Sequence, residues 1–172
     1  MTTFVTEPSE SWIIGYGNPQ RRDDGIGPYI VGRLQNRFKE SGHIRFRTTH
    51  QLEPALVEEL GHADRLVLVD ATLKKLRDGW ECARIRSESG ALPYLTHHIK
   101  PSFLLALLES VYHRSPRTWL ASVQGDDFGF GEGLTPEAEA RAKKAMSAIF
   151  DLVGAHGIDK TDNPYTLLED EV

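Results

Sequence analysis

The chain has 172 residues, of which 40% are hydrophobic and 26% charged, a size and composition typical of one globular domain with a single core. Its formal net charge of -5 disfavours a nucleic-acid-binding protein, which usually carries a basic surface. No apolar run approaches the roughly 18 residues that span a bilayer, and the polar residues 1–11 lack the layout of a secretory signal. The single cysteine, Cys82, excludes an internal disulfide and a multi-cysteine zinc site, so we expect a cytoplasmic protein.

The N-terminal part of the chain alternates strand-like and helix-like segments. Residues 11–16 form a short apolar run that ends near glycine and predict a buried strand. After a loop at 17–25, apolar residues recur about every four positions, which predicts a helix over residues 26–38. Residues 44–49 alternate apolar and polar side chains, as an edge strand does.

The middle of the chain repeats this alternation. Apolar spacing over residues 52–60 predicts a second amphipathic helix, with Gly61 as its C-terminal stop. Residues 65–71 contain four consecutive branched apolar side chains, the pattern of a central strand buried on both faces. Residues 80–86 follow an Asp-Gly turn signal and predict a strand that pairs antiparallel at the edge of the sheet.

The C-terminal part adds two helices and a strand. Pro101 suits the first position of a helix that carries several leucines, and residues 117–124 predict the last strand. Thr135, followed by proline and glutamate, predicts the start of a helix that runs to about Val153. The polar and acidic residues beyond it predict a loosely ordered tail.

Alternating strands and helices predict an α/β fold. We expect a single-domain three-layer sandwich, in which a mostly parallel, twisted, open sheet of about five strands lies between helices. The predicted domain covers residues 11–153, with an N-terminal extension at 1–10 and a polar C-terminal tail at 154–172.

Acidic and histidine side chains fall where such a sheet binds ligands, at the carboxyl ends of its strands. Asp23 and Asp24 close the loop after the first strand, Asp70 ends the predicted central strand, and His97 and His98 precede the third helix. Taken singly, each has an ordinary explanation as a helix-dipole partner, a helix cap or a surface residue. Together, two carboxylates and an imidazole make an oxygen and nitrogen metal site that leaves positions open for another molecule.

Other site types fit less well. Gly15-Tyr16-Gly17 resembles the start of a dinucleotide-binding loop, but Gln20 occupies the third glycine position and the two carboxylates would repel a pyrophosphate. The chain contains neither H-E-x-x-H nor G-x-S-x-G. Cys82 lies in a predicted strand, where a small buried hydrophobic role is expected.

Residues 14–27, IGYGNPQRRDDGIG, closely resemble the opening motif of the hydrogenase maturation protease family, in which G-x-G-N precedes an acidic pair and a glycine. Three further blocks resemble that family in the same order. They are QLEP at 51–54 with LVLVDA at 66–71, THH at 96–98, and FGFGEGLTP at 128–136. The resemblance extends over roughly residues 11 to 150, which is nearly all of the predicted domain.

The resemblance implies specific site residues. Matched position by position, the implied metal ligands are Asp24, Asp70 and His97, with His98 as the alternative to His97. Many members have glutamate where this chain has Asp24, so the carboxylate here is one methylene shorter. The resemblance further implies an aspartic-type hydrolase, for which the candidate catalytic groups are Asp24, Asp70 and Asp23. Two mechanisms stay open. In the first, the metal polarises the scissile carbonyl or lowers the pKa of a water, and Asp24 or Asp70 acts as the base. In the second, the metal only anchors the substrate, and Asp23 or a nearby acid moves the proton.

The resemblance also implies a partner. Members of the family remove a C-terminal extension from the large-subunit precursor of nickel-iron hydrogenase, and nickel already held by the precursor is the recognition signal. We therefore expect nickel to arrive with the substrate, and we expect no organic cofactor, no nucleic-acid or membrane partner and a monomeric chain. Two alternatives remain: a nickel-sensing chaperone or checkpoint that binds the precursor without cleaving it, and a flavodoxin-shaped binder of a small molecule or nucleotide.

Overall fold

Five strands form one sheet in the structure, a computed structural model that describes residues 10–38, 42–88 and 99–154. In chain order the strands are β1 (Ser11–Tyr16), β2 (Ile44–Thr49), β3 (Arg65–Thr72), β4 (Trp80–Ile85) and β5 (Arg117–Gln124). Their spatial order is β2-β1-β3-β5-β4, and only β4 runs antiparallel to its neighbour. The carboxyl ends of the other four strands therefore meet at one edge of the sheet.

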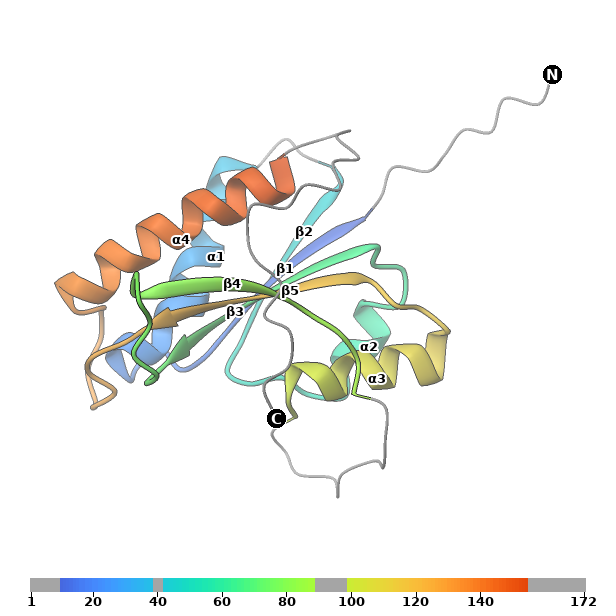
Figure 1. Ribbon diagram of the computed structural model, residues 1–172, viewed down its shortest axis with the longest axis horizontal. Coiled ribbons are helices and arrows are strands. Elements are labelled where there is room, and N and C mark those ends of the chain that lie inside the picture. The colour runs from blue at the N-terminus through green and yellow to red at the C-terminus, as the bar shows by residue number, and fades with distance from the viewer. Residues whose placement is uncertain (1–9, 39–41, 89–98, 155–172) are drawn as a thin grey trace.

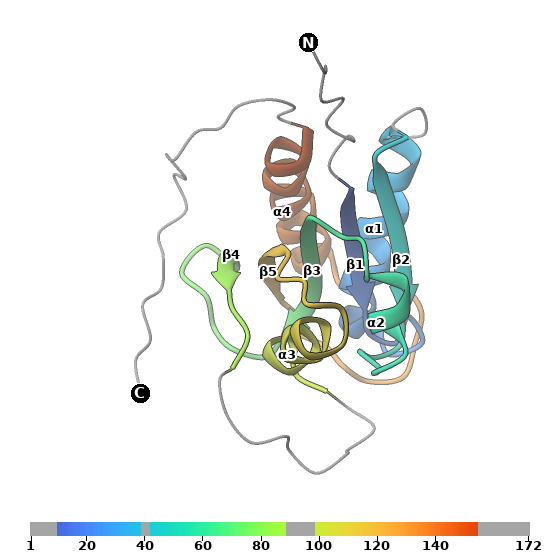
Figure 2. The same cartoon turned by 90° about the vertical axis from the view of Figure 1, so that its right-hand side faces the viewer.

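Helices cover both faces of this sheet. They are the 3-10 turn η1 (Arg22–Gly25) and the helices α1 (Ile26–Arg37), α2 (Leu56–Glu59), α3 (Pro101–Tyr112) and α4 (Pro136–Gly154). Helices α1 and α4 lie against one face, and α2 and α3 against the other (Figure 1 and Figure 2). Among the described residues, no helix combines the length and the apolar character that crossing a bilayer requires.

Strand side chains alternate between two cores, one on each face of the sheet. Ile13, Val67 and Val69 pack toward α1 and α4, whereas Ile14 and Leu68 pack toward α2 and α3. All five side chains are at most 2% exposed. The central strands are apolar on both faces because helices cover both faces.

Gly27 brings the first turn of α1 close to the sheet. A Cβ atom at this position would lie 2.5 Å from the backbone oxygen of Val69 and 2.6 Å from that of Tyr16. Glycine is therefore needed for α1 to approach β1 and β3 so closely. Because Asp24 lies just before α1 and Asp70 just after Val69, this approach also brings the two carboxylates to the same place.

Most of the predicted fold is confirmed. The sheet has five strands between helices, the strand at residues 44–49 lies at an edge, and β4 pairs antiparallel with β5. Thr135 caps α4 as predicted, because its Oγ1 accepts a hydrogen bond of 3.3 Å from the Ala138 N–H. The predicted extension and tail lie, but for Glu10 and Gly154, outside the described residues.

Several elements differ in detail from the prediction. The helix predicted over residues 52–60 is a single turn, α2, because Pro54 disfavours helical backbone at the residue before it. Asp70 does not end the central strand, since β3 continues to Thr72 by pairing Ala71 and Thr72 with β5. The loop predicted at 17–25 contains the turn η1, and β4 stops one residue short of the predicted end.

Candidate functional site

Asp24 is positioned by the loop that connects β1 with α1. This loop turns sharply at Gly17, whose φ of +131° is in a region that residues with a Cβ atom rarely adopt. The Asn18 N–H then donates a hydrogen bond of 2.8 Å to Oδ2 of Asp24. The turn η1 carries Asp24 at the partly buried carboxyl edge of the sheet. The loop thus holds the carboxylate in place through its own backbone.

Replacing Gly17 by alanine should disturb this site directly. A Cβ atom at Gly17 would lie 1.9 Å from the backbone oxygen of Asp24, and the positive φ adds strain. We expect the Gly17→Ala variant to lose about 3 kcal/mol of unfolding free energy, measured by urea denaturation. Gly32→Ala in α1 is the matched control, because a Cβ atom there meets nothing within 4 Å, and it should raise stability by about 0.5 kcal/mol. Equal stability of the two variants would contradict this view of the loop.

Asp70 lies next to the end of β1 within the sheet. Gly15 pairs with Val69, so the following residues, Tyr16 and Asp70, are neighbours where β1 ends. Burial raises the pKa of the Asp70 carboxyl to about 6, even though hydrogen bonds from the Tyr16 hydroxyl and the Ala71 N–H lower it. The charge of Asp24 raises the pKa further. Asp70 is therefore a partly desolvated acid that faces a second acid.

Tyr16 is a site residue that the sequence analysis did not identify. Its hydroxyl is hydrogen-bonded to Asp70, and burial together with the Asp70 charge raises the pKa of Tyr16 well above its usual range. The tyrosine therefore stays protonated and acts as a donor. Sequence reasoning noted Gly15-Tyr16-Gly17 only for its glycines, and the register between β1 and β3 is the information that identifies the tyrosine.

Removing the Tyr16 hydroxyl should raise the pKa of Asp70 above 6 in the metal-free protein. The hydroxyl donates to the carboxylate and stabilises its charged form, so Tyr16→Phe removes an interaction that lowers this pKa. A pH titration of the side-chain carboxyl carbons by NMR would measure the change. The control is Tyr29→Phe, which removes a hydrogen bond of 2.9 Å to Glu139 and should leave Asp70 unchanged. An unchanged or lower Asp70 pKa in Tyr16→Phe would contradict the assignment.

The Asp24 and Asp70 carboxylates form a pair suited to a cation. Their mutual repulsion contributes to the raised pKa of Asp70, and a positive ion between them would relieve it. Within residues 10–38, 42–88 and 99–154, no three His, Cys, Asp or Glu side chains gather into a metal site. His97 and His98 lie outside these described residues. An ion bound by Asp24 and Asp70 would therefore have coordination positions free for further ligands.

Asp23 makes its contacts with a different part of the chain and holds two loops together. It is fully buried, and its carboxylate accepts hydrogen bonds from the N–H groups of Asp126, Asp127 and Thr135 and from the Thr135 hydroxyl, at 2.7 to 3.0 Å. Burial alone would raise the pKa of Asp23, but these hydrogen bonds outweigh it and lower the pKa. A buried carboxylate with four donors and a lowered pKa favours a structural role. Its predicted role as a proton carrier stays a prediction.

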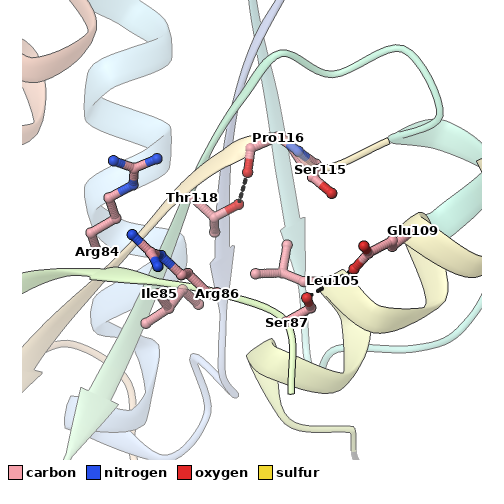
Figure 3. A pocket seen from close by; sticks show the side chains of 9 residues that line it. All are labelled: Arg84, Ile85, Arg86, Ser87, Leu105, Glu109, Ser115, Pro116 and Thr118. Carbon is pink, nitrogen blue, oxygen red and sulfur yellow. Dashed lines mark hydrogen bonds between the residues drawn. The ribbon is translucent and has the colours of Figure 1, made fainter. Parts of the chain in front are cut away.

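Other polar features lie away from the carboxylate pair. Cys82 is on β4, and burial raises the pKa of its thiol to about 11, in keeping with the predicted packing role. A cavity of about 250 Å³ lies between the end of β4, the start of β5 and α3 (Figure 3). Because β5 begins there, this cavity is at the opposite edge of the sheet from Asp70. It contains no side chain of the predicted site.

The loop after β1 offers little to a nucleotide. A dinucleotide-binding loop leaves its backbone N–H groups free for phosphate oxygens. Here the Asn18 N–H bonds to Asp24, the Gln20 N–H to the Asn18 side chain, and the Arg22 N–H to the Gly131 backbone oxygen. These contacts support the rejection of a nucleotide site that the sequence suggested.

Comparison with known proteins identifies solved structures that share this fold. No family model and no curated protein matches the sequence. Several solved structures do match the fold, among them the hydrogenase maturating endopeptidase HybD from E. coli, with 21% identity over 86% of this chain and 94% of that one and a TM-score of 0.71. The [NiFe] hydrogenase maturation protease HycI from Thermococcus kodakarensis KOD1 has 18% identity over 85% and 93% of the two chains, with a TM-score of 0.66.

A third structure extends this likeness. A solution structure of an endopeptidase from Escherichia coli matches over 87% of this chain and 94% of that one, with 20% identity and a TM-score of 0.69. At such identities the comparison establishes that the fold is shared.

Proposed function

We propose that this chain is a hydrogenase maturation endopeptidase, which recognises nickel in the precursor of a nickel-iron hydrogenase large subunit and removes the precursor's C-terminal extension. The observation that carries the proposal is the pairing of Asp24 and Asp70 at the carboxyl edge of the sheet. These are the acidic positions that the motif resemblance implies, and the fold is that of solved hydrogenase maturation proteases.

Nickel recognition would operate by completing a coordination sphere. The precursor carries nickel as cargo, and Asp24 and Asp70 would add carboxylate oxygens to it, with His97 or His98 as the third ligand. Without the ion the two carboxylates repel each other. A nickel-free precursor would therefore gain no binding free energy from Asp24 and Asp70. Specificity would then be the difference in affinity between loaded and empty precursors.

Among the candidate catalytic acids, the proton-transfer role fits Asp70 or Asp24 better than Asp23. A general base works best when its pKa is near the working pH, and the pKa of Asp70 is raised to about 6. Asp23 has a lowered pKa and its carboxylate already accepts four hydrogen bonds. We propose that Asp23 holds the loops while Asp24 and Asp70 face the substrate. We also propose a monomeric, cytoplasmic enzyme.

A processing assay tests this function. The purified chain is incubated with nickel-loaded and with nickel-free precursor, and the mass of the precursor is followed by mass spectrometry. The proposal expects loss of the C-terminal extension only from the loaded precursor. Nickel-dependent binding without loss of mass would instead support the checkpoint alternative, and neither binding nor cleavage would reject both.

A further inference from the structure

Two large apolar side chains protrude into solvent at the end of the sheet that carries Asp24 and Asp70. Phe130 is 90% exposed and Leu73 is 76% exposed, the highest values among the large hydrophobic residues that the structure describes. Leu73 follows β3 directly, and Phe130 lies in the loop between β5 and α4. Figure 1 shows these two connections at the same end of the sheet. The exposed apolar surface is thus next to the candidate site.

The exposure of Phe130 does not result from a poorly anchored loop. On one side of it, the Gly129 N–H donates to Oδ1 of Asp127 at 2.8 Å. On the other side, the Gly131 N–H donates to the Gln20 oxygen at 3.0 Å, and the Gly131 oxygen accepts from the Arg22 N–H at 2.9 Å. The loop therefore holds the aromatic ring out in water, although burying it would be favourable.

The backbone of Arg22 at this junction is itself strained. Its φ is +45°, in the left-handed region that residues other than glycine seldom adopt. Such strain persists where the surrounding structure enforces it, and it concentrates at functional sites. The Arg22 N–H bonds to the Gly131 oxygen, and Arg21 forms an isolated bridge with Gly131. These contacts join the loop that carries Phe130 to the loop that carries Asp24.

We infer that Phe130 and Leu73 are docking contacts for the hydrogenase large-subunit precursor, an inference that rests on the proposed function. A precursor that brings its nickel to Asp24 and Asp70 must cover the surface around them, because a protein interface buries about 800 Å² on each partner. Leu73 is three residues beyond Asp70, and the residue after Phe130 pairs with the loop that leads to Asp24. Both side chains are within such a footprint.

The chemistry of the patch indicates what the partner offers. Exposed aromatic side chains act as anchors when they fill an apolar pocket on the partner. Two exposed basic residues lie next to these side chains: Lys74 follows Leu73 directly, and Arg21 pairs with Gly131, the residue after Phe130. The precursor should therefore present an apolar pocket for Phe130 and a smaller apolar contact for Leu73. Phe130 should contribute more to binding than Leu73, since aromatic residues dominate interface anchors.

Surface plasmon resonance on immobilised nickel-loaded precursor tests this inference. We expect Phe130→Ala to weaken binding about tenfold or more and Leu73→Ala about threefold or more. The matched control is Val111→Ala, because Val111 is 60% exposed on α3 close to where β5 begins, at the other end of the sheet. That variant should bind like the wild type. Both anchor residues are exposed, so the melting temperatures should stay within about 2 °C of the wild-type value.

Two results would overturn the inference. One is wild-type affinity in both Phe130→Ala and Leu73→Ala. The other is self-association of the wild type that Phe130→Ala abolishes without a change in precursor affinity, which would make a second copy the occupant of the patch. If the wild type binds the precursor without cleaving it, the proposed peptidase activity fails while the docking contacts can still be measured.

Discussion

Asp70→Asn should abolish processing and nickel-dependent association while making the protein more stable at pH 8. Asparagine has nearly the same shape, and its side-chain oxygen still accepts the Tyr16 hydrogen bond, but it removes a charge from a desolvated place beside Asp24. Loss of a carboxylate ligand should reduce processing by a factor of at least about 100. The same loss of charge should add about 2 kcal/mol to the free energy of unfolding.

The sign of this stability change depends on pH. The folded-state pKa of Asp70 is about 6, above the ordinary value of 3.8, so the wild type loses stability as the pH rises through that interval. Well below pH 3.8 the aspartic acid is neutral in both states, so at pH 4 most of the advantage of asparagine should already be lost. Urea denaturation at pH 8 and pH 4 measures the difference. Full processing by Asp70→Asn would remove Asp70 from the ligand set, and a loss of stability at pH 8 would contradict its desolvated environment.

Asp23→Asn should destabilise the protein by about 3 kcal/mol, because four donors converge on this buried carboxylate. An asparagine offers one acceptor oxygen, and its amide group would face N–H donors that need an acceptor. The loss of unfolding free energy should be largest above pH 3.8. Because the pKa of Asp23 is lowered in the folded state, its ionised form stabilises the wild type above that pH. This stabilisation fades as the pH falls below 3.8.

Asp127→Asn is the matched control for this substitution. Asp127 lies in the same loop, and its ion pair with Arg22 is nearly half exposed on both sides, so its loss should cost less than about 1 kcal/mol. Turnover of Asp23→Asn is then measured at low temperature, where the variant is folded. Unchanged turnover would eliminate Asp23 as a proton carrier. Wild-type stability of Asp23→Asn would show that the carboxylate does not hold the two loops together.

Asp23 and Asp24 have different environments that the sequence alone did not predict. The two acids are adjacent and belong to one motif, so sequence alone supports the same candidate roles for both. The turn η1 separates them: Asp23 is buried against the loop after β5, and Asp24 stays at the sheet edge. The loop that surrounds Asp23 comes from more than 100 residues later in the chain, and no local pattern reveals it.

The strands were predictable because each combines a local apolar pattern with a nearby turn signal. Arg65–Thr72 and Trp80–Ile85 are examples. The Asp-Gly turn predicted an antiparallel edge strand, but the partner of β4 is β5 and not the preceding strand β3, and no local signal identifies it. The role of Tyr16 was not predictable, since it depends on the register of β1 against β3. Boundaries such as that of α2 depend on single residues, here Pro54, whose local effect overrides the apolar spacing.

X-ray absorption at the nickel edge tests most directly whether Asp24 and Asp70 bind the precursor's nickel. The spectrum is recorded for loaded precursor alone and for a sample rapidly frozen after mixing with the protein. The account predicts additional oxygen ligands on nickel with the wild-type chain, and none with Asp70→Asn. A nickel spectrum that the wild-type chain leaves unchanged, in a sample shown to contain the complex, would contradict it.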